Sequence, residues 1–257
     1  MTYVVAIANQ KGGVGKTTTA VNLSASLAVA EQRVLLIDMD PQGNATSGLG
    51  RDPKGGLEGT YGLLQGGLGL DEAIVPSDLP NLELITASAD LAAIELEFAN
   101  VEDRSSRLKE IVSALRGRYD YIIIDCPPSL GILTINALVA ADAVLVPMQC
   151  EYYALEGLSQ LMNTVERVRG SFNPSLRIDG VLLCMFDPRS NLSSEVANEL
   201  RKHFHVYDTV IPRNIRLAEA PSYGKPIILY DAASKGSAGY LNLAREILSG
   251  PTPRAAA

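Results

Sequence analysis

The strongest constraint on this chain is a glycine-rich segment near its N-terminus, Gln10-Lys11-Gly12-Gly13-Val14-Gly15-Lys16-Thr17-Thr18. A short apolar run at residues 3–8 precedes it, and residues 17–30 carry alanine, leucine and valine at helical spacing. A strand, a glycine-rich turn that ends in Gly-Lys-Thr, and a helix form the context of a phosphate-binding loop. Glycines let backbone N–H groups close around phosphate oxygens, and the helix N-terminus adds the positive end of its dipole. The segment therefore predicts a site for a nucleoside phosphate.

The loop contains two lysines, and only one has an obvious place. Lys16 is expected to bind the β- and γ-phosphates, and the Thr17 hydroxyl to ligate Mg²⁺. The common form of the loop has glycine where this chain has Gln10, and it does not require lysine at the next position, where Lys11 stands. Lys11 reaches a phosphate only if something turns it towards one, and a partner subunit is one way to do so.

Composition favours a folded cytoplasmic protein. Hydrophobic residues make up 47% of the chain and charged residues 20%, which is enough for a sizeable core. No apolar run approaches the ~18 residues of a membrane span, so no membrane partner is expected. The charge is uneven: residues 1–159 hold 10 Lys/Arg and 20 Asp/Glu, whereas residues 160–257 hold 12 and 9. The positive second half hints at a polyanion partner.

Strands and helices alternate along the chain. Continuous apolar runs such as residues 34–37 and 121–124 are typical of parallel strands covered on both faces, and no composition break marks a linker. We therefore predict one α/β domain over residues 1–250, a doubly wound, mostly parallel sheet flanked by helices. The expected strands are residues 3–8, 33–38, 82–86, 120–125, 143–148, 179–185, 208–212 and 227–230. The expected helices are residues 17–30, 90–99, 104–116, 131–140, 155–169, 193–203 and 237–248.

Two segments are expected to lack regular structure. Residues 50–69 are glycine-dense and predict a mobile surface loop. The tail at residues 251–257, Pro-Thr-Pro-Arg-Ala-Ala-Ala, predicts a disordered end.

Three aspartates follow predicted strands, at the ends where ligands of such sheets bind. Asp38 and Asp40 close the second strand, and Asp125 closes the strand at residues 120–125. The last is a Walker B pattern, in which buried apolar residues precede an acid that holds Mg²⁺ directly or through water. An isolated aspartate after a strand is more often a helix cap or a turn residue. The phosphate loop in the same chain favours the metal role instead.

Several blocks, in order, resemble the ParA/Soj chromosome- and plasmid-partitioning ATPases, which are deviant Walker A P-loop proteins of the MinD/ParA superfamily. The first three blocks are residues 11–18, Asp38-Met39-Asp40-Pro41-Gln42-Gly43-Asn44 and Asp125-Cys126-Pro127-Pro128-Ser129-Leu130. The match continues through residues 149–158 and closes with residues 211–222. It covers the chain up to about residue 250 and is far more specific than the loop alone.

The resemblance implies a slow, partner-stimulated ATPase that uses ATP and Mg²⁺. ATP would promote a sandwich dimer in which Lys11 of each subunit reaches the phosphates of the other, as an arginine finger does elsewhere. The catalytic residues it implies are Lys11, Lys16 and Asp40, the last positioning the attacking water. The nucleotide-binding residues are Lys11, Gly12, Gly13, Val14, Gly15, Lys16, Thr17, Thr18, Met185, Pro212 and Asn214, with the last three near the adenine. Thr17, Asp38 and Asp125 would hold the metal and its waters.

The resemblance also implies partners. Arg189 and Arg216 match positions that bind the DNA backbone in the family. Contact with the phosphates of duplex DNA of any sequence is expected, because no helix carries a helix-turn-helix signature. The chain starts at its first strand, so we expect it to lack the added N-terminal domain of some plasmid relatives. The resemblance further implies a homodimer when ATP is bound and a location on the nucleoid. It also implies a ParB-type centromere-binding protein that stimulates hydrolysis.

Two other classes share this core. A MinD-like membrane-associated division-site regulator needs a basic amphipathic C-terminal helix, whereas residues 240–248 are followed by a small tail without lysine clusters. An iron–sulfur reductase of the nitrogenase iron-protein type needs two cluster cysteines in matching segments. Cys126 is not so placed, and Cys126, Cys150 and Cys184 are expected as free buried thiols. DNA partition is the favoured function, with chromosome or plasmid cargo left open.

Overall fold

The computed structural model describes residues 2–56, 58–151 and 154–250. Within these ranges eight strands form one sheet in the order β3-β4-β2-β5-β1-β6-β7-β8. Neighbouring strands are parallel, except that β3 is antiparallel to β4. The strands are β1 (Tyr3–Ile7), β2 (Val34–Asp38), β3 (Ile74–Pro76), β4 (Leu82–Ile85), β5 (Tyr121–Asp125), β6 (Ala143–Gln149), β7 (Arg177–Phe186) and β8 (Val206–Pro212). The predicted mostly parallel α/β sheet is confirmed.

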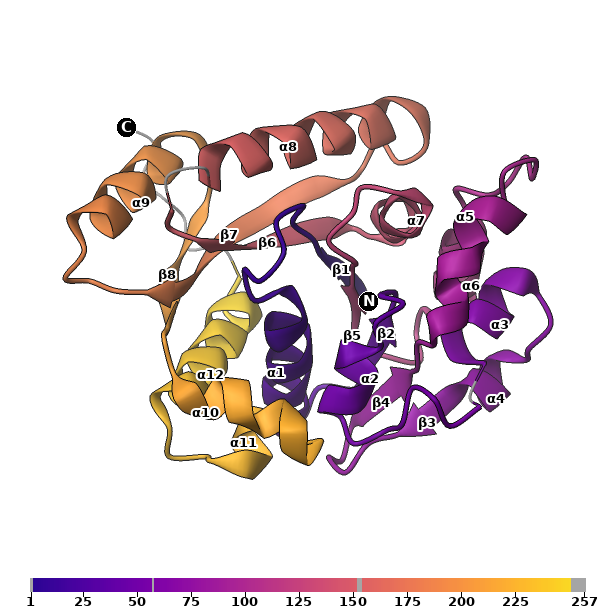
Figure 1. Cartoon of the computed structure of the whole chain (residues 1–257), viewed down its shortest axis with the longest axis horizontal. Coiled ribbons are helices and arrows are strands. Elements are labelled where there is room, and N and C mark those ends of the chain that lie inside the picture. The colour runs from indigo at the N-terminus through magenta and orange to yellow at the C-terminus, as the bar shows by residue number, and fades with distance from the viewer. Residues whose placement is uncertain (1, 57, 152–153, 251–257) are drawn as a thin grey trace.

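Helices cover both faces of the sheet, with α7, α8 and α9 above it in Figure 1 and α1, α11 and α12 below. One face packs against α3 (Gly59–Gln65), α5 (Ile94–Glu97), α6 (Arg107–Leu115), α7 (Ile132–Ala140), α8 (Ala154–Ser171) and α9 (Asn191–His203). The other packs against α1 (Lys16–Val29), α2 (Asn44–Gly48), α10 (Ile215–Glu219), α11 (Ile227–Tyr230) and α12 (Lys235–Leu248). The helix α4 (Leu70–Ala73) and two 3₁₀ turns, Ala89–Ala93 and Ala220–Tyr223, lie between these elements. No helix of the described ranges is long and apolar enough to cross a membrane.

The central strand β1 shows why both faces are covered. Val4 and Ala6 pack into one core layer, while Val5 and Ile7 pack into the other, as the two-residue period of a strand requires. In register, Ile7 lies opposite Asp125 of β5. The loops that follow β1, β2 and β5 therefore meet at one edge of the sheet.

One predicted strand is wrong. Residues 227–230 form the single-turn helix α11 rather than a strand. The N–H of Ile227 donates to Asn22 Oδ1 at 2.7 Å, and the N–H of Tyr230 donates to the Pro226 carbonyl at 3.1 Å. A four-residue apolar run has too few residues for its period to separate strand from helix. The other predicted strands correspond to β1, β2 and β4 to β8, and the short edge strand β3 was not predicted.

The glycine-dense segment is also more regular than predicted. Residues 59–65 form α3, and Leu64 is fully buried in the core. The Thr60 hydroxyl donates to the Asp38 carbonyl at 2.8 Å, so packing and tertiary hydrogen bonds outweigh the low helix propensity of glycine here. The predicted tail at residues 251–257 lies outside the described residues, and the domain boundary at residue 250 stays a prediction.

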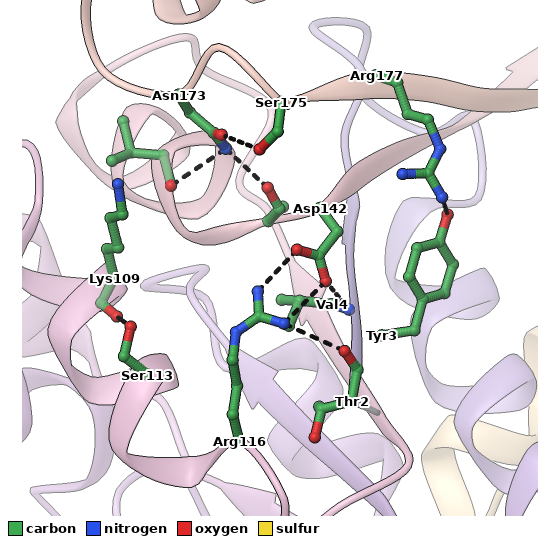
Figure 2. Close-up of polar contacts among 12 residues, drawn as sticks. Thr2, Tyr3, Val4, Lys109, Ser113, Arg116, Asp142, Asn173, Ser175 and Arg177 are labelled. Atoms are coloured by element: carbon green, nitrogen blue, oxygen red, sulfur yellow. Dashed lines mark hydrogen bonds and ion pairs between the residues drawn. The ribbon is translucent and has the colours of Figure 1, made fainter.

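Asp142 binds the start of the chain to the sheet (Figure 2). One of its oxygens accepts from the Val4 N–H at 2.9 Å, and its carboxylate pairs with Arg116 at 2.7 Å. Arg116 also donates to the Thr2 carbonyl at 3.1 Å. Asp142 and Arg116 therefore hold the N-terminal end of β1 in place through its backbone.

Asn173, beside this cluster in Figure 2, caps the end of α7. Its buried Nδ2 donates to three backbone carbonyls, those of Leu138, Val139 and Ala141, at 3.1, 3.2 and 2.7 Å. The last carbonyls of a helix have no partner within the helix, so a side-chain donor here satisfies them.

Replacement of Asn173 by alanine is expected to lower the free energy of unfolding by about 1–3 kcal/mol, because buried carbonyls lose their donor. Urea denaturation with an unchanged m value measures this loss. Ser175→Ala is the control: it removes only a hydroxyl that donates to Asn173 Oδ1 at 2.9 Å, and should cost about 1 kcal/mol or less. Equal losses in the two variants would contradict the capping role.

Candidate functional site

The loop between β1 and α1 has the backbone of a phosphate site. Gly13 and Gly15 have φ angles of +74° and +95°, in a region that residues with a Cβ rarely adopt. Helix α1 begins at Lys16, and Gly15 at its N-cap has no side chain to accept from the first N–H groups. These donors are therefore left for a ligand.

A cleft of about 610 Å³ opens beside the loop. Its wall contains Gly12, Gly13, Gly15, Lys16, Thr17 and Thr18 from the loop, Asp40 from the segment after β2, and Met185, Pro212 and Asn214 from the ends of β7 and β8. The structure thus gathers most of the residues assigned to the nucleotide around one cavity. Lys11, Val14, Asp38 and Asp125 are not part of this wall.

An irregularity at the end of β7 places Met185 in the cleft wall. The register against β8 shifts between Cys184 and Phe186, and Met185 has a φ of +50°. A non-glycine residue with positive φ is uncommon, and such residues concentrate at ligand sites. Across the cleft wall, Asn214 Oδ1 accepts from the Arg216 N–H at 2.8 Å and so caps α10.

Asp38 is fully buried, and its own chain uses both of its oxygens. One accepts from the Asp40 N–H at 3.1 Å, and the other accepts from the N–H and the hydroxyl of Thr46, each at 2.8 Å. Burial raises the pKa of Asp38 to about 6, although the hydrogen bonds from Thr46 oppose this shift. Asp38 therefore fixes the segment that carries Asp40, whose Oδ1 accepts from the Gln42 N–H at 3.0 Å.

Asp125 is equally buried but lacks such support. Neither of its oxygens has a hydrogen-bond partner among the residues that the structure describes. Burial raises its pKa well above the ordinary value, and the neighbouring carboxylate of Asp38, opposite it in the sheet register, adds to the shift, whereas the nearby Thr17 side chain opposes it. Unpartnered carboxylate oxygens beside a phosphate loop match the ligands that Mg²⁺ prefers. With Thr17 in the cleft wall and its side chain near Asp125, the residues present fit this ion.

The two loop lysines have different partners. Lys16 Nζ donates to the Lys11 carbonyl at 3.1 Å, across the loop itself. Burial lowers the pKa of Lys16, while the nearby carboxylate of Asp125 opposes that shift. Lys11 Nζ instead forms an ion pair with Glu151, in the segment that follows β6.

Arg189 and Arg216, assigned to DNA, lie outside the cleft wall and are each paired with acids of their own chain. Arg189 contacts both oxygens of Asp187 at 3.1 Å, and its side chain is 88% exposed. Arg216 contacts Glu219 at 2.9 Å and Asp231 at 3.4 Å, and its side chain is 54% exposed. Water screens such exposed pairs, so each contributes little and a phosphate can compete for the arginine.

Sequence reasoning missed the roles of Thr46 and Glu151. Thr46 binds Asp38 from eight residues further along the chain, and no local pattern links the two. Glu151 lies within the block at residues 149–158, but its partner Lys11 is 140 residues away. For Glu151, its position inside the block at residues 149–158 was the one signal in the sequence, and that block does not indicate Lys11 as the partner.

The sheet, the loop and the strand-end aspartates define a P-loop nucleotide-binding protein. A family model described as an AAA domain matches residues 2–178. The chromosome partitioning protein ParA of Caulobacter vibrioides is 56% identical over 250 residues, 96% of this chain and 94% of that protein. The sporulation initiation inhibitor protein Soj of Bacillus subtilis is 55% identical over 249 residues, 96% of this chain and 98% of that protein. The chain belongs to the ParA/Soj family of chromosome-partitioning ATPases, which confirms the resemblance.

A solved structure agrees with this assignment at the level of the fold. Cobyrinic acid a,c-diamide synthase from Mycobacterium smegmatis, with a bound ATP analogue and magnesium, is 37% identical. Its TM-score is 0.86, over 96% of this chain and 94% of that chain. The family relatives named ParA and Soj are considerably closer in sequence.

The raised pKa values of Asp38 and Asp125 predict a stability that falls with rising pH. The folded state keeps protons that the unfolded chain releases above about pH 4, so both groups destabilise the fold increasingly as the pH rises from about 4, and for Asp38 this continues to about pH 6. Asp125→Asn removes one buried charge. It should raise the free energy of unfolding at pH 7 by about 1 kcal/mol or more, and by less at pH 4.5.

Thermal and urea unfolding of parent and variant at the two pH values test this. Asp120→Asn is the opposite control, because Arg33 lowers the pKa of Asp120 to about 2. The stabilisation from Asp120 is present above pH 4 and is lost as the pH falls through 2, so this variant should be less stable at pH 7. If the gain in the free energy of unfolding of Asp125→Asn did not grow with pH, the buried charge of Asp125 would not be what destabilises the fold.

Proposed function

We propose that this protein is a DNA-partitioning ATPase that binds ATP and Mg²⁺ in the cleft, pairs with a second copy, and in that form binds duplex DNA of any sequence. The observation that carries the proposal is the division of the two loop lysines. Lys16 lies in the wall of its own cleft, whereas Lys11 lies outside it and pairs with Glu151. A lysine held at the loop but away from its own site is suited to act on the nucleotide of a second copy.

Within one subunit, the cleft residues take the roles expected for phosphoryl transfer. Lys16 and the loop N–H groups bind the β- and γ-phosphates, and Thr18 the α-phosphate. Met185, Pro212 and Asn214 surround the adenine. Thr17 and Asp125 would hold Mg²⁺ with support from Asp38, and the ion would supply positive charge to the phosphates.

Hydrolysis converts ATP and water to ADP and phosphate. Asp40, which Asp38 fixes through its backbone N–H, orients the attacking water. Lys11 from the second copy adds positive charge to the transferring phosphoryl group, so turnover depends on pairing and is slow in a lone subunit. This dependence suits a switch better than a metabolic enzyme.

The partners follow from the relatives. A ParB-type centromere-binding protein stimulates hydrolysis and releases the dimer from DNA, which moves a chromosome or plasmid over the nucleoid in the cytoplasm. Relatives named ParA and Soj at 53–56% identity support this proposal over the MinD-like alternative. The DNA surface is placed on the positive C-terminal portion, around Arg189 and Arg216. Pairing doubles the number of phosphates that the protein can bind, so ATP switches DNA binding on.

Exchange of each lysine for alanine should separate binding from pairing. Lys16→Ala is expected to weaken Mg-ATP binding by about 100-fold or more, because the phosphates lose a buried counter-charge. Lys11→Ala should bind ATP normally but lose ATP-dependent dimerisation and hydrolysis. Calorimetric titration measures the first property, and light scattering with a non-hydrolysable analogue measures the second. A stable Lys11→Ala dimer with normal turnover would refute the action of Lys11 across the interface.

The Arg189→Ala/Arg216→Ala variant should dimerise with ATP but bind all duplexes more weakly. For every DNA phosphate that the variant no longer neutralises, the slope of log affinity against log salt should flatten by about 0.9. Gel shifts on unrelated duplexes at several salt concentrations measure both effects. Arg33→Ala is the matched control, since Arg33 is also an exposed arginine paired with an aspartate, Asp120. Undiminished DNA binding by the double variant would show that the DNA surface lies elsewhere.

A further inference from the structure

The ion pair between Lys11 and Glu151 joins two distant parts of the chain. Lys11 belongs to the loop after β1, and Glu151 to the segment after β6. Their side chains are 39% and 44% exposed. The lysine that the proposed function assigns to a second copy is therefore already engaged within its own chain.

The backbone of Lys11 is fixed, so only its side chain can change partner. Its N–H donates to Asn9 Oδ1 at 3.0 Å, and its carbonyl accepts from Lys16 Nζ at 3.1 Å. The buried Asn9 Nδ2 in turn donates to the Pro147 carbonyl of β6 at 2.7 Å. The same strand, β6, leads to Glu151 two residues after its end. Strand β6 thus positions both the phosphate loop and the carboxylate of Glu151. The ion pair between Lys11 and Glu151 therefore forms without movement of the backbone.

We infer that Glu151 competes for Lys11 within the lone subunit and thereby sets the ATP concentration at which two copies pair. The inference rests on the proposed function, in which Lys11 acts across the dimer. Before pairing, Glu151 neutralises Lys11 and holds its side chain on its own subunit. On pairing, the phosphates of the partner's ATP replace this carboxylate.

The balance of charge makes this exchange feasible. A pair between half-exposed groups is weak, because water screens both charges. A triphosphate carries several negative charges, whereas Glu151 carries one. The triphosphate therefore displaces Glu151 from Lys11 once a second copy with bound ATP is present. The intrachain pair breaks twice in each dimer, so even a weak pair shifts the midpoint of dimerisation measurably.

Glu151→Gln tests the inference, because it keeps the length of the side chain and removes its charge. Light scattering across a titration of a non-hydrolysable ATP analogue with Mg²⁺ gives the midpoint of dimerisation. We expect the midpoint to fall about 3- to 10-fold relative to the parent. Nucleotide affinity, measured at protein concentrations too low for pairing, should not change. Glu195→Gln, an exposed acid on α9 with no ion pair among the described residues, is the matched control and should overlay the parent.

Two further readouts separate competition from a general charge effect. Added salt weakens the pair in the parent, so the gap between parent and Glu151→Gln should narrow as salt rises. In the Lys11→Ala background, Glu151→Gln should have no effect, because there is no lysine left to release. Recovery of dimerisation by the Lys11→Ala/Glu151→Gln variant would overturn the inference, since Glu151 would then act by repulsion between subunits.

The outcomes also separate this inference from the function beneath it. An unchanged or raised midpoint for Glu151→Gln, with Lys11→Ala still unable to pair, overturns the inference alone. Normal pairing by Lys11→Ala overturns the proposed action of Lys11 across the dimer.

Discussion

The parallel register that sets Asp38 beside Asp125 is the constraint on which the site depends. Both aspartates are the last residues of neighbouring strands, and both are buried. Two carboxylates in such a position resist ionisation together, so the surroundings must compensate their charge. Asp38 receives three hydrogen bonds from its own chain, whereas only the nearby Thr17 side chain and the charge of Lys16 oppose the effect of burial on Asp125. The two buried carboxylates therefore call for a compensating positive charge, which a cation such as Mg²⁺ supplies.

Hydrogen bonds extend this constraint to segments that are distant in sequence. The Thr60 hydroxyl on α3 donates to the Asp38 carbonyl at 2.8 Å, and the Thr46 hydroxyl accepts from the Ala87 N–H at 2.9 Å. The turn after β2 and the helix α3 are thus bound to Asp38 directly, and the segment after β4 is bound to it through Thr46. Asp40 lies within this network, so its position depends on all three segments. The glycine-dense residues 50–69, which include α3, consequently help to position the site and do not form only a surface loop.

Local patterns in the sequence predicted those parts of the site whose geometry is itself local. The phosphate loop is one continuous strand-turn-helix, and Asp125 ends an apolar run, so residue spacing suffices to place both. The pair between Lys11 and Glu151 escaped prediction because its members come from different strand ends and meet only through the sheet order. The acids around Arg189 and Arg216 are partly adjacent in sequence, but their contacts depend on rotamers that no pattern encodes. Residues 227–230 were assigned wrongly because side-chain periodicity carries no information over four apolar residues, and the hydrogen bond from Ile227 to Asn22 joins residues 205 positions apart.

The position of β1 in the middle of the sheet has a consequence for synthesis of the chain. β1 leaves the ribosome before both of its neighbours and pairs with β5 and β6, with Tyr3 opposite Tyr121 and Val5 opposite Ala143. At about 5–20 residues per second, β1 waits roughly ten seconds for its first neighbour, with its apolar side chains unpaired. Parallel pairing over such a separation is slow and exposes the growing chain to aggregation. The nucleotide site is built on this strand, so ATP can stabilise the finished fold by mass action but cannot guide the nascent chain towards it.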